Sequence, residues 1–362
     1  LPDGITGVAK KVEEMGLKFG LWFEPEMTNK ESQLYREHPD WILSVPGRKV
    51  SVGRNQYVLD FSREEVVDAI FEQMKKVLTE APISYIKWDM NRSMSEVYSA
   101  GAGAKDQGKV MHKYILGVYR LYDMLTKEFP EILFESCASG GARFDPGLLY
   151  YAPQCWTSDD TDAVERCKIQ YGTSLVYPIS SMGAHVSAVP NHQLLRNTSL
   201  EMRANVAYFG TFGYELDPNR MTEEEKEEVK EQIAFMKQYR HLIQYGTFYR
   251  LLSPFEGNEM AWMVVSEDKS QALVGYYKIL QSVNGPYKKV RLQGLDPDRK
   301  YHVADRGEGA YGEECYEEDL YGDELLWYGL NVSDASSGEN KQKYNGKNGD
   351  YQSRLYLLSS IG

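Results

Sequence analysis

The chain has 362 residues, of which 42% are hydrophobic and 26% are charged, with 41 Lys and Arg against 53 Asp and Glu. The formal net charge of -12 argues against a nucleic-acid binder, which needs a basic face, and against a partner selected by anionic lipid. No apolar run reaches the roughly 18 residues that a membrane-spanning helix needs.

The first two-thirds of the chain alternate short apolar runs with amphipathic stretches. Strands are predicted at residues 18–24, 85–88, 132–137, 154–158, 179–183 and 211–216. Helices are predicted at residues 7–16, 63–80, 109–129, 162–176, 199–209 and 222–245, the last with Thr222 as the N-cap of an acidic first turn. Apolar strands separated by helices indicate βαβ units and a parallel sheet.

After Gly246 the pattern changes to strand-like segments at residues 260–265, 272–280, 290–295 and 354–358, separated by turn residues such as Asn284-Gly285. No helical stretch of comparable length intervenes. We therefore predict a parallel α/β domain over residues 1–246 and a small C-terminal antiparallel β domain over residues 247–362. Residues 336–348, which are polar and rich in Gly and Asn, predict a mobile loop.

The first domain contains about six strand–helix units. An open doubly wound sheet can have six strands, whereas a closed (β/α)8 barrel has eight, so a barrel implies that two strand–helix units are missing. The chain also opens with Leu1-Pro2-Asp3-Gly4, without an initiator Met or a signal segment. We therefore expect a piece of a longer protein or a processed product.

The cysteine pattern and the absence of several sequence motifs argue against a disulfide framework and against three common kinds of active or cofactor site. The four cysteines form no C-x-x-C pair and predict no disulfide framework, so we expect a cytoplasmic protein with reduced thiols. No H-x-H, H-E-x-x-H or G-x-S-x-G motif occurs, and no G-x-G-x-x-G follows a strand, so metal-dependent hydrolysis, an esterase-type serine and dinucleotide binding lack support. No metal or organic cofactor is implied. The cysteines are Cys137, Cys155, Cys167 and Cys315.

Polar residues gather where the predicted strands end, which is where parallel α/β folds place their catalytic groups. Carboxylates recur at these ends and histidines do not. Beside the candidates discussed below, Glu24 and Glu26 are expected to shape the first strand end, Glu135 to be structural, and His185 to be either structural or a ligand contact. The residues at the strand ends are Trp22, Glu24, Glu26, Lys87, Asp89, Asn91, Arg92, Glu135, Cys137, Asp159, Asp160, Asp162 and His185.

The chemistry that remains uses two carboxylates, and glycoside hydrolysis is its commonest form on a barrel. One carboxylate attacks the anomeric carbon while the other protonates the leaving oxygen, and about 5–5.5 Å between them marks the retaining route. Asp89 stands out because a nearby Lys87 would lower its pKa, although the two could instead form a structural ion pair. The acid stays open among Asp159, Asp160 and Asp162, one of which can cap the following helix.

The strand ends lie in six sequence segments whose order and residues together resemble those of a known enzyme family. In order they are KFGLWFEPEM (18–27), VGRNQYVLDFS (52–62), KWDMNR (87–92), ESCASGGARFD (135–145), WTSDDTDA (156–163) and MGAHVSAVPNHQ (182–193). Together they resemble glycoside hydrolase family 36, the bacterial α-galactosidases, over essentially the whole chain. The resemblance implies a (β/α)8-barrel catalytic domain over residues 1–246, here missing its first two strands, and a C-terminal antiparallel β-sandwich domain over residues 247–362. It also implies retaining hydrolysis of terminal α-linked galactose from melibiose- and raffinose-type sugars, without a cofactor.

The resemblance also implies residue roles. Asp89 in K-W-D-M-N-R would be the nucleophile, and Asp159, the first Asp of W-T-S-D, would be the acid/base. Lys87 would donate to the galactose hydroxyls and Asn91 would line the same pocket. The other positions that match the family's sugar site are Trp22, Arg54, Cys137 and Gly140.

The chain departs from the family at its front. Family members carry an N-terminal β-sandwich and a D-D-G-W motif whose Asp pair binds galactose, whereas the only Asp-Asp here is Asp159-Asp160. We therefore expect an N-terminally incomplete α-galactosidase with little or no activity alone, and a homo-oligomer only for the full-length form. The alternatives are a galactosyl-transferring or α-N-acetylgalactosaminidase relative, or a non-catalytic fragment that needs a complementing chain.

Overall fold

The computed structural model describes residues 3–143, 145–283, 288–306, 317–332 and 349–361. The chain divides into two compact units, Leu1–Asp159 and Asp160–Gly362. This division falls elsewhere than the predicted domain boundary at Gly246, which stays a prediction. The predicted loop at residues 336–348, the Asn284-Gly285 turn and Cys315 lie outside the described residues.

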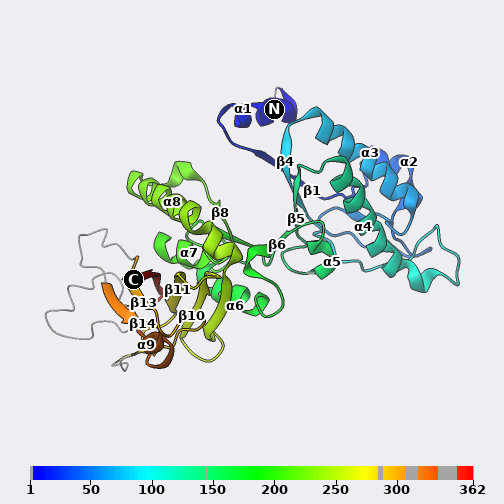
Figure 1. Cartoon of the computed structure of the whole chain (residues 1–362). Coiled ribbons are helices and arrows are strands. Elements are labelled where there is room, and N and C mark those ends of the chain that lie inside the picture. Colours follow the sequence, from blue (N-terminus) through cyan, green and yellow to red (C-terminus); the bar gives the residue numbers. More distant parts are fainter. Residues whose placement is uncertain (1–2, 144, 284–287, 307–316, 333–348, 362) are drawn as a thin grey trace. The chain divides into compact units, whose positions relative to one another are not determined.

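A parallel sheet in the order β1–β4–β5–β6 forms the centre of the first unit (Figure 1). The strands predicted at residues 18–24, 85–88, 132–137 and 154–158 are confirmed, with small differences at their ends. Their bounds are β1 (Phe19–Phe23), β4 (Ile83–Trp88), β5 (Leu133–Ser136) and β6 (Gln154–Trp156). The unit's other elements are α1 (Gly4–Glu14), β2 (Met27–Thr28), α2 (Gln33–Glu37), β3 (Tyr57–Val58), α3 (Glu64–Glu80), α4 (Val110–Glu128) and α5 (Pro146–Leu149).

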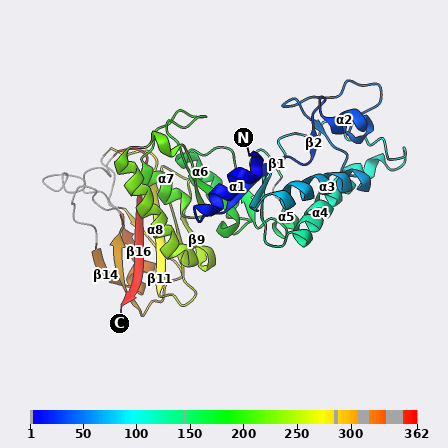
Figure 2. The same cartoon turned by 90° about the horizontal axis from the view of Figure 1, so that it is seen from above.

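Helices α3 and α4 lie side by side over this sheet in both views (Figures 1 and 2). In α3 the buried residues recur at helical spacing from Val66 to Leu78, so one face of the helix enters the core. The helix stops at Ala81, which is extended because Pro82 follows it. In α4, Gly117 allows close approach to the Phe61 carbonyl, where a side chain would clash.

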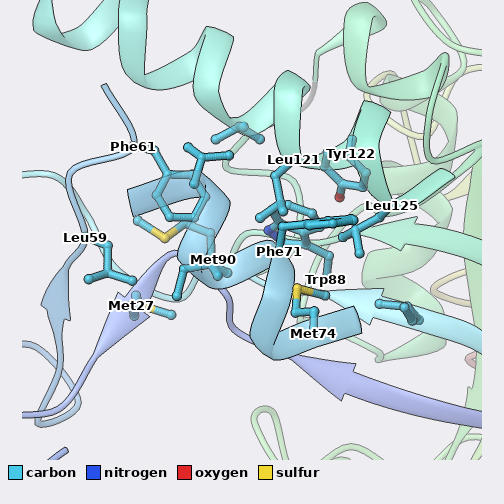
Figure 3. Close-up of a cluster of buried hydrophobic side chains, with 14 of the residues drawn as sticks. Met27, Leu59, Phe61, Phe71, Met74, Trp88, Met90, Leu121, Tyr122 and Leu125 are labelled. Atoms are coloured by element: carbon cyan, nitrogen blue, oxygen red, sulfur yellow. The ribbon is translucent and has the colours of Figure 1, made fainter. Parts of the chain in front are cut away.

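The core of the first unit centres on Trp88, the last residue of β4 (Figure 3). Its indole is fully buried and stacks on Tyr122 of α4, with 3.9 Å between the ring centroids. Met74 and Leu125 belong to the same cluster. Because dense packing on both sides fixes Trp88, it also fixes the direction in which the chain leaves β4 at Asp89.

The second unit contains the remaining strand–helix pairs and an antiparallel sheet in the order β14–β13–β16–β11–β10–β9, in which β11 and β16 run side by side (Figure 2). Strands β7 (Met182–Ser187) and β8 (Thr211–Glu215) pair in parallel. The helices are α6 (Ala163–Thr173), α7 (Leu200–Ala207), α8 (Glu223–Tyr245) and α9 (Gly322–Trp327). The other strands are β9 (Thr247–Leu252), β10 (Glu259–Val265), β11 (Gln271–Lys278), β12 (Lys289–Val290), β13 (Lys300–Asp305), β14 (Glu317–Tyr321), β15 (Leu330–Asn331) and β16 (Gln352–Ile361).

Strand β10 shows why this sheet is buried on both faces. Met260, Trp262 and Val264 pack with residues of α7 and α8, while the alternate residues Ala261 and Met263 pack in a second core. The period of two in the side-chain direction assigns each set to one face. None of the helices among the described residues has both the length and the apolar character needed to cross a membrane.

Two strand predictions in this unit need correction, and other strands were missed. The strand predicted at 179–183 begins only at Met182, because Ile179–Ser181 form a 3-10 turn after Pro178. The strand predicted at 290–295 ends at Val290. The prediction also missed β9, β13 and β14, whose mixed polar and apolar residues gave no continuous apolar run. By contrast, the predicted N-cap Thr222 is confirmed and forms a capping box with Glu225.

Candidate active site

Adjacent strands place the first candidate residues at one edge of the sheet. In the β1–β4 register, Trp22 lies opposite Lys87, and the Asp89 amide then donates to the Phe23 carbonyl at 2.8 Å. On the other side, the Cys137 amide donates to the Trp88 carbonyl at 2.8 Å. The parallel ladder therefore continues one residue past β4 and holds the peptide group between Trp88 and Asp89 from both sides.

Asp89 is buried, with an exposed fraction of 6%. Its Oδ2 accepts hydrogen bonds from Trp22 Nε1 at 3.1 Å and from Asn91 Nδ2 at 2.6 Å. Burial alone would raise the pKa of the carboxyl, but hydrogen bonds from Trp22, Asn91, the Cys137 thiol and the Ser139 amide outweigh it and lower the pKa. Asp89 is therefore a buried, ionised carboxylate.

Asn91 connects Asp89 to a second carboxylate, Glu24. The Asn91 Nδ2 donates to Glu24 Oε1 at 2.9 Å, and its Oδ1 accepts from Ser139 Oγ at 3.0 Å. Glu24 Oε2 accepts from Gln56 Nε2 at 2.6 Å, and Arg54 Nη1 lies 3.9 Å from Glu24 Oε1. We call the set Trp22, Glu24, Gln56, Asp89 and Asn91 the Asp89 cluster.

One alternative from the sequence was an ion pair between Lys87 and Asp89, and the structure does not contain it. The Lys87 Nζ lies 3.2 Å from Glu135 Oε1 and 4.5 Å from the centre of the Trp156 ring. Glu135 is almost fully buried and also accepts from Tyr85 Oη. The predicted lowering of the Asp89 pKa is confirmed in direction, but its cause is the set of hydrogen-bond donors described above. Glu135 holds the ammonium of Lys87 in place.

Cys137 lies against the nucleophile candidate. Its side chain is 4% exposed, and its thiol is one of the groups that lower the Asp89 pKa. Burial raises the thiol pKa to about 12, so the group is a neutral donor at physiological pH. Cys155 and Cys167 are likewise buried free thiols, as predicted.

Gly140, in the loop after β5, packs closely against the segment after β6 that contains Asp159. Its φ is +81°, and a side-chain carbon placed there would lie 2.6 Å from the Ser158 Cα and 2.8 Å from the Asp159 amide nitrogen. Only glycine fits such a contact. Gly140 therefore sets the backbone position of Asp159, whose own side chain is exposed.

The structure separates the three candidates for the acid. Asp162 is buried, caps α6 by accepting from the Val164 and Glu165 amides, and pairs with Arg196. Asp160 Oδ1 accepts from the Asp162 amide at 3.0 Å. Asp162 is thus the helix cap that the sequence allowed, and of the two remaining candidates only Asp159 is exposed.

A second acidic residue of the first strand end is wholly structural. Glu26 is fully buried and forms a two-pronged ion pair with Arg143, at 2.7 and 2.8 Å. Trp88 Nε1 and Tyr114 Oη donate to the same carboxylate at 2.7 and 2.5 Å. We call these four residues the Glu26 cluster. Burial lowers the Arg143 pKa, but the Glu26 charge and hydrogen bonds outweigh it and raise the pKa.

Of the predicted site residues, Trp22 and Asn91 donate hydrogen bonds to Asp89, and Arg54 approaches it through Glu24. The backbone of Cys137 bonds Trp88 and Met90, the residues on either side of Asp89. His185 Nδ1 lies 3.4 Å from Glu215 Oε2, which leaves its role open. Sequence reasoning missed Gln56, because no pattern marks a lone amide in a loop. Within the described ranges, no group of three His, Cys, Asp or Glu residues is arranged to hold a metal ion.

Two family profiles match the sequence. The Melibiase profile matches residues 1–246, and the profile described as the glycosyl hydrolase family 36 C-terminal domain matches residues 259–358. Together the two matches cover most of the chain.

Individual relatives are also similar. The chain is 57% identical to alpha-galactosidase AgaA of Geobacillus stearothermophilus over 93% of this chain and 45% of the relative, and 50% identical to alpha-galactosidase Mel36A of Lactobacillus acidophilus over 86% and 43%. The crystal structure of an AgaA variant in complex with raffinose superposes with a TM-score of 0.91 at 53% identity, covering 100% of this chain and 47% of that one. The chain thus spans less than half the length of these relatives.

Proposed function

The chain belongs to the Melibiase family of glycosyl hydrolases and carries the family 36 C-terminal domain; from this premise, we propose that it is the catalytic part of a retaining α-galactosidase. The observation that carries the proposal is the Asp89 carboxylate, buried yet held ionised by Trp22 and Asn91 at the end of β4. A nucleophilic carboxylate must be ionised when the substrate arrives.

In the first step, an Asp89 oxygen forms a bond to the anomeric carbon of the galactosyl residue. The bond from that carbon to the leaving oxygen breaks, and Asp159 gives its proton to that oxygen. The exposed position of Asp159 suits a group that must exchange a proton with solvent in each cycle.

In the second step, Asp159 takes a proton from a water molecule as the water oxygen attacks the anomeric carbon. The bond to Asp89 breaks and galactose leaves with its original anomeric configuration. Lys87, Asn91, Arg54, Trp22, Cys137 and Gly140 are proposed to bind the sugar. Lys87 is suited to donate to hydroxyls because Glu135 and the Trp156 ring hold its ammonium.

The proposed substrates are α-galactosides of the melibiose and raffinose type, supported by the raffinose complex of the AgaA variant. We also propose that residues 1–246 and 247–362 are separate domains, which the limits of the two family profiles support. A cytoplasmic location is proposed from the buried free thiols of Cys137, Cys155 and Cys167.

Coverage of less than half of each relative favours one further candidate, a fragment that is inactive until a complementing segment is present. The test is a chimera in which this chain replaces the matching segment of AgaA. We expect the chimera to hydrolyse p-nitrophenyl α-galactoside, with α-galactose as the first product by NMR, and the 362-residue chain alone to show little turnover. A folded, inactive chimera would contradict the proposed function, and β-galactose as first product would contradict the retaining route.

A further inference from the structure

Glu24 occupies a position between the proposed nucleophile and a loop that faces solvent. Its side chain is 9% exposed, and both carboxylate oxygens are engaged. Oε1 accepts from Asn91, and Oε2 accepts from Gln56. A mostly buried carboxylate with both oxygens engaged is fixed in place, because any rotation would leave a partly buried donor without its acceptor.

The loop that Glu24 holds is a tight turn. The Gln56 amide donates to the Gly53 carbonyl at 2.9 Å, and Arg54 and Asn55 have φ values of +52° and +61°. Positive φ at two successive residues without glycine is strained, so the turn persists only where contacts hold it. Arg92 bonds the Gln56 carbonyl at 3.3 Å, and Glu24 bonds the Gln56 side chain. Arg54 projects from this turn and is 57% exposed.

The side-chain amide of Asn91 links Glu24 to Asp89. One Nδ2 group donates to both Glu24 Oε1 and Asp89 Oδ2, so each carboxylate takes one of its two protons. The Asn91 amide is thereby held on three sides, with Ser139 Oγ donating to its oxygen. Without Glu24, Asn91 would lose one of its three anchors.

We propose that Glu24 is a positioning residue that couples the Arg54 turn to the Asp89 nucleophile through Asn91. It touches neither substrate nor the reacting atoms; it fixes two groups that do. The inference rests on the proposed function for its consequence in catalysis, but the coupling itself is a property of the folded chain.

The coupling is tested on the 362-residue chain by hydrogen exchange of the Asn91 side-chain amide, observed by NMR after selective ¹⁵N labelling and assigned by loss of its signal in Asn91→Ala. Glu24→Ala should speed this exchange by about tenfold, since about 1.4 kcal/mol of protection corresponds to that factor. Glu24→Asp, which withdraws the carboxylate by one methylene, serves if Glu24→Ala does not fold. The matched control is Glu31→Ala, since Glu31 is an exposed acid in the segment between β2 and α2. It should leave the exchange rate of the Asn91 side-chain amide unchanged.

The double variant Glu24→Gln, Gln56→Glu reverses the donor and acceptor between these two residues. The amide introduced at position 24 can accept from Asn91 through its oxygen and donate through its nitrogen to the carboxylate introduced at position 56. Protection of the Asn91 side chain should therefore return to the wild-type value. Unchanged exchange in Glu24→Ala, or no recovery in the double variant, overturns the coupling.

The kinetic consequence is read in the AgaA chimera. Glu24→Ala should lower kcat/KM by about tenfold, mostly through KM because the Arg54 turn is released, and the double variant should recover it. A loss of kcat alone overturns the role assigned to the turn. If the parent chimera is inactive, the proposed function fails, whereas the exchange measurement still decides the coupling.

Discussion

Glu24 and Glu26 are separated by one proline, yet the Asp89 cluster and the Glu26 cluster differ in nearly every physical respect. Glu26 is fully buried, and its oxygens accept four hydrogen bonds, including two from Arg143. The Asp89 cluster contains two carboxylates and reaches solvent through Trp22, which is 47% exposed. A saturated, neutralised cluster supports the fold, whereas a partly open cluster with excess negative charge has capacity for chemistry.

The largest effect that separates the two clusters is expected from a substitution at Asp89. Asp89→Asn keeps the shape of the side chain and removes the ionised oxygen, so in the AgaA chimera we expect kcat to fall by about 10³-fold or more. The free energy of unfolding of the 362-residue chain should change by less than about 1 kcal/mol. Steady-state kinetics and urea denaturation measure the two effects, and a near-wild-type rate would remove the nucleophile assignment.

Glu26→Gln should have the opposite profile. It leaves Arg143 buried without its counter-charge and turns an NH₂ group toward donors, so the chain should lose about 3–5 kcal/mol of unfolding free energy. Urea denaturation of the chain checks this, and Glu37→Gln, at an exposed position on α2, is the control. A loss below about 1 kcal/mol would show that the Glu26 cluster does not support the fold as described.

Gly140→Ala tests the loop that serves both clusters, since Ser139 donates to Asn91 of the Asp89 cluster while Arg143 pairs with Glu26. A β-carbon at φ +81° would press on the Ser158 and Asp159 backbone, so we expect a loss of about 1–3 kcal/mol in stability. The chimera should lose rate as well because Asp159 moves. Gly103→Ala, which has open space and lies in another loop, is the matched control.

The smallest expected effect is on pH dependence. Trp22→Phe removes a hydrogen bond that lowers the Asp89 pKa, so that pKa should rise. Because the reaction needs Asp89 ionised, the acidic limb of kcat/KM should move to higher pH, and the rate at neutral pH should fall by less than about tenfold. A pH profile of the chimera checks this, and an unchanged or lower acidic limb contradicts it.

The same lowered pKa links stability to pH. The folded chain is stabilised by the Asp89 carboxylate above the group's ordinary pKa, and this contribution is lost as the pH falls through the lowered pKa. Trp22→Phe should reduce the contribution, so its stability should differ most from wild type at neutral pH and least in acid.

The sequence predicted most of the parallel strands and helices because apolar runs and amphipathic stretches are local signals. It also marked the strand ends, so Trp22, Asp89 and Asn91 could be grouped before any distance was known. The resemblance to family 36 then chose Asp159 among three acids, and the capping role of Asp162 supports that choice. Strands such as β13, half polar along their length, carried too weak a pattern to be found.

The sequence could not predict which charged side chains form ion pairs or hydrogen bonds with one another. Lys87 and Asp89 are two residues apart at the end of one strand, which suggested an ion pair, but the β4–β5 register places Glu135 opposite Lys87. Glu24 and Glu26 look alike in sequence, and only Arg143, more than a hundred residues away, makes one of them structural. Long-range partners decide the role of a charged residue, and single-sequence patterns do not contain them.

The central claim, that the Asp89 cluster carries the nucleophile, is tested most directly by locating a trapped glycosyl–enzyme bond. The AgaA chimera would be incubated with a 2-deoxy-2-fluoro-α-galactosyl fluoride, which slows the second step, and then digested for peptide mass spectrometry. The account predicts one added fluorogalactosyl group on Asp89, absent in Asp89→Asn and retained in Asp159→Asn. A modification on any other residue, or none in a chimera that hydrolyses α-galactosides, would contradict it.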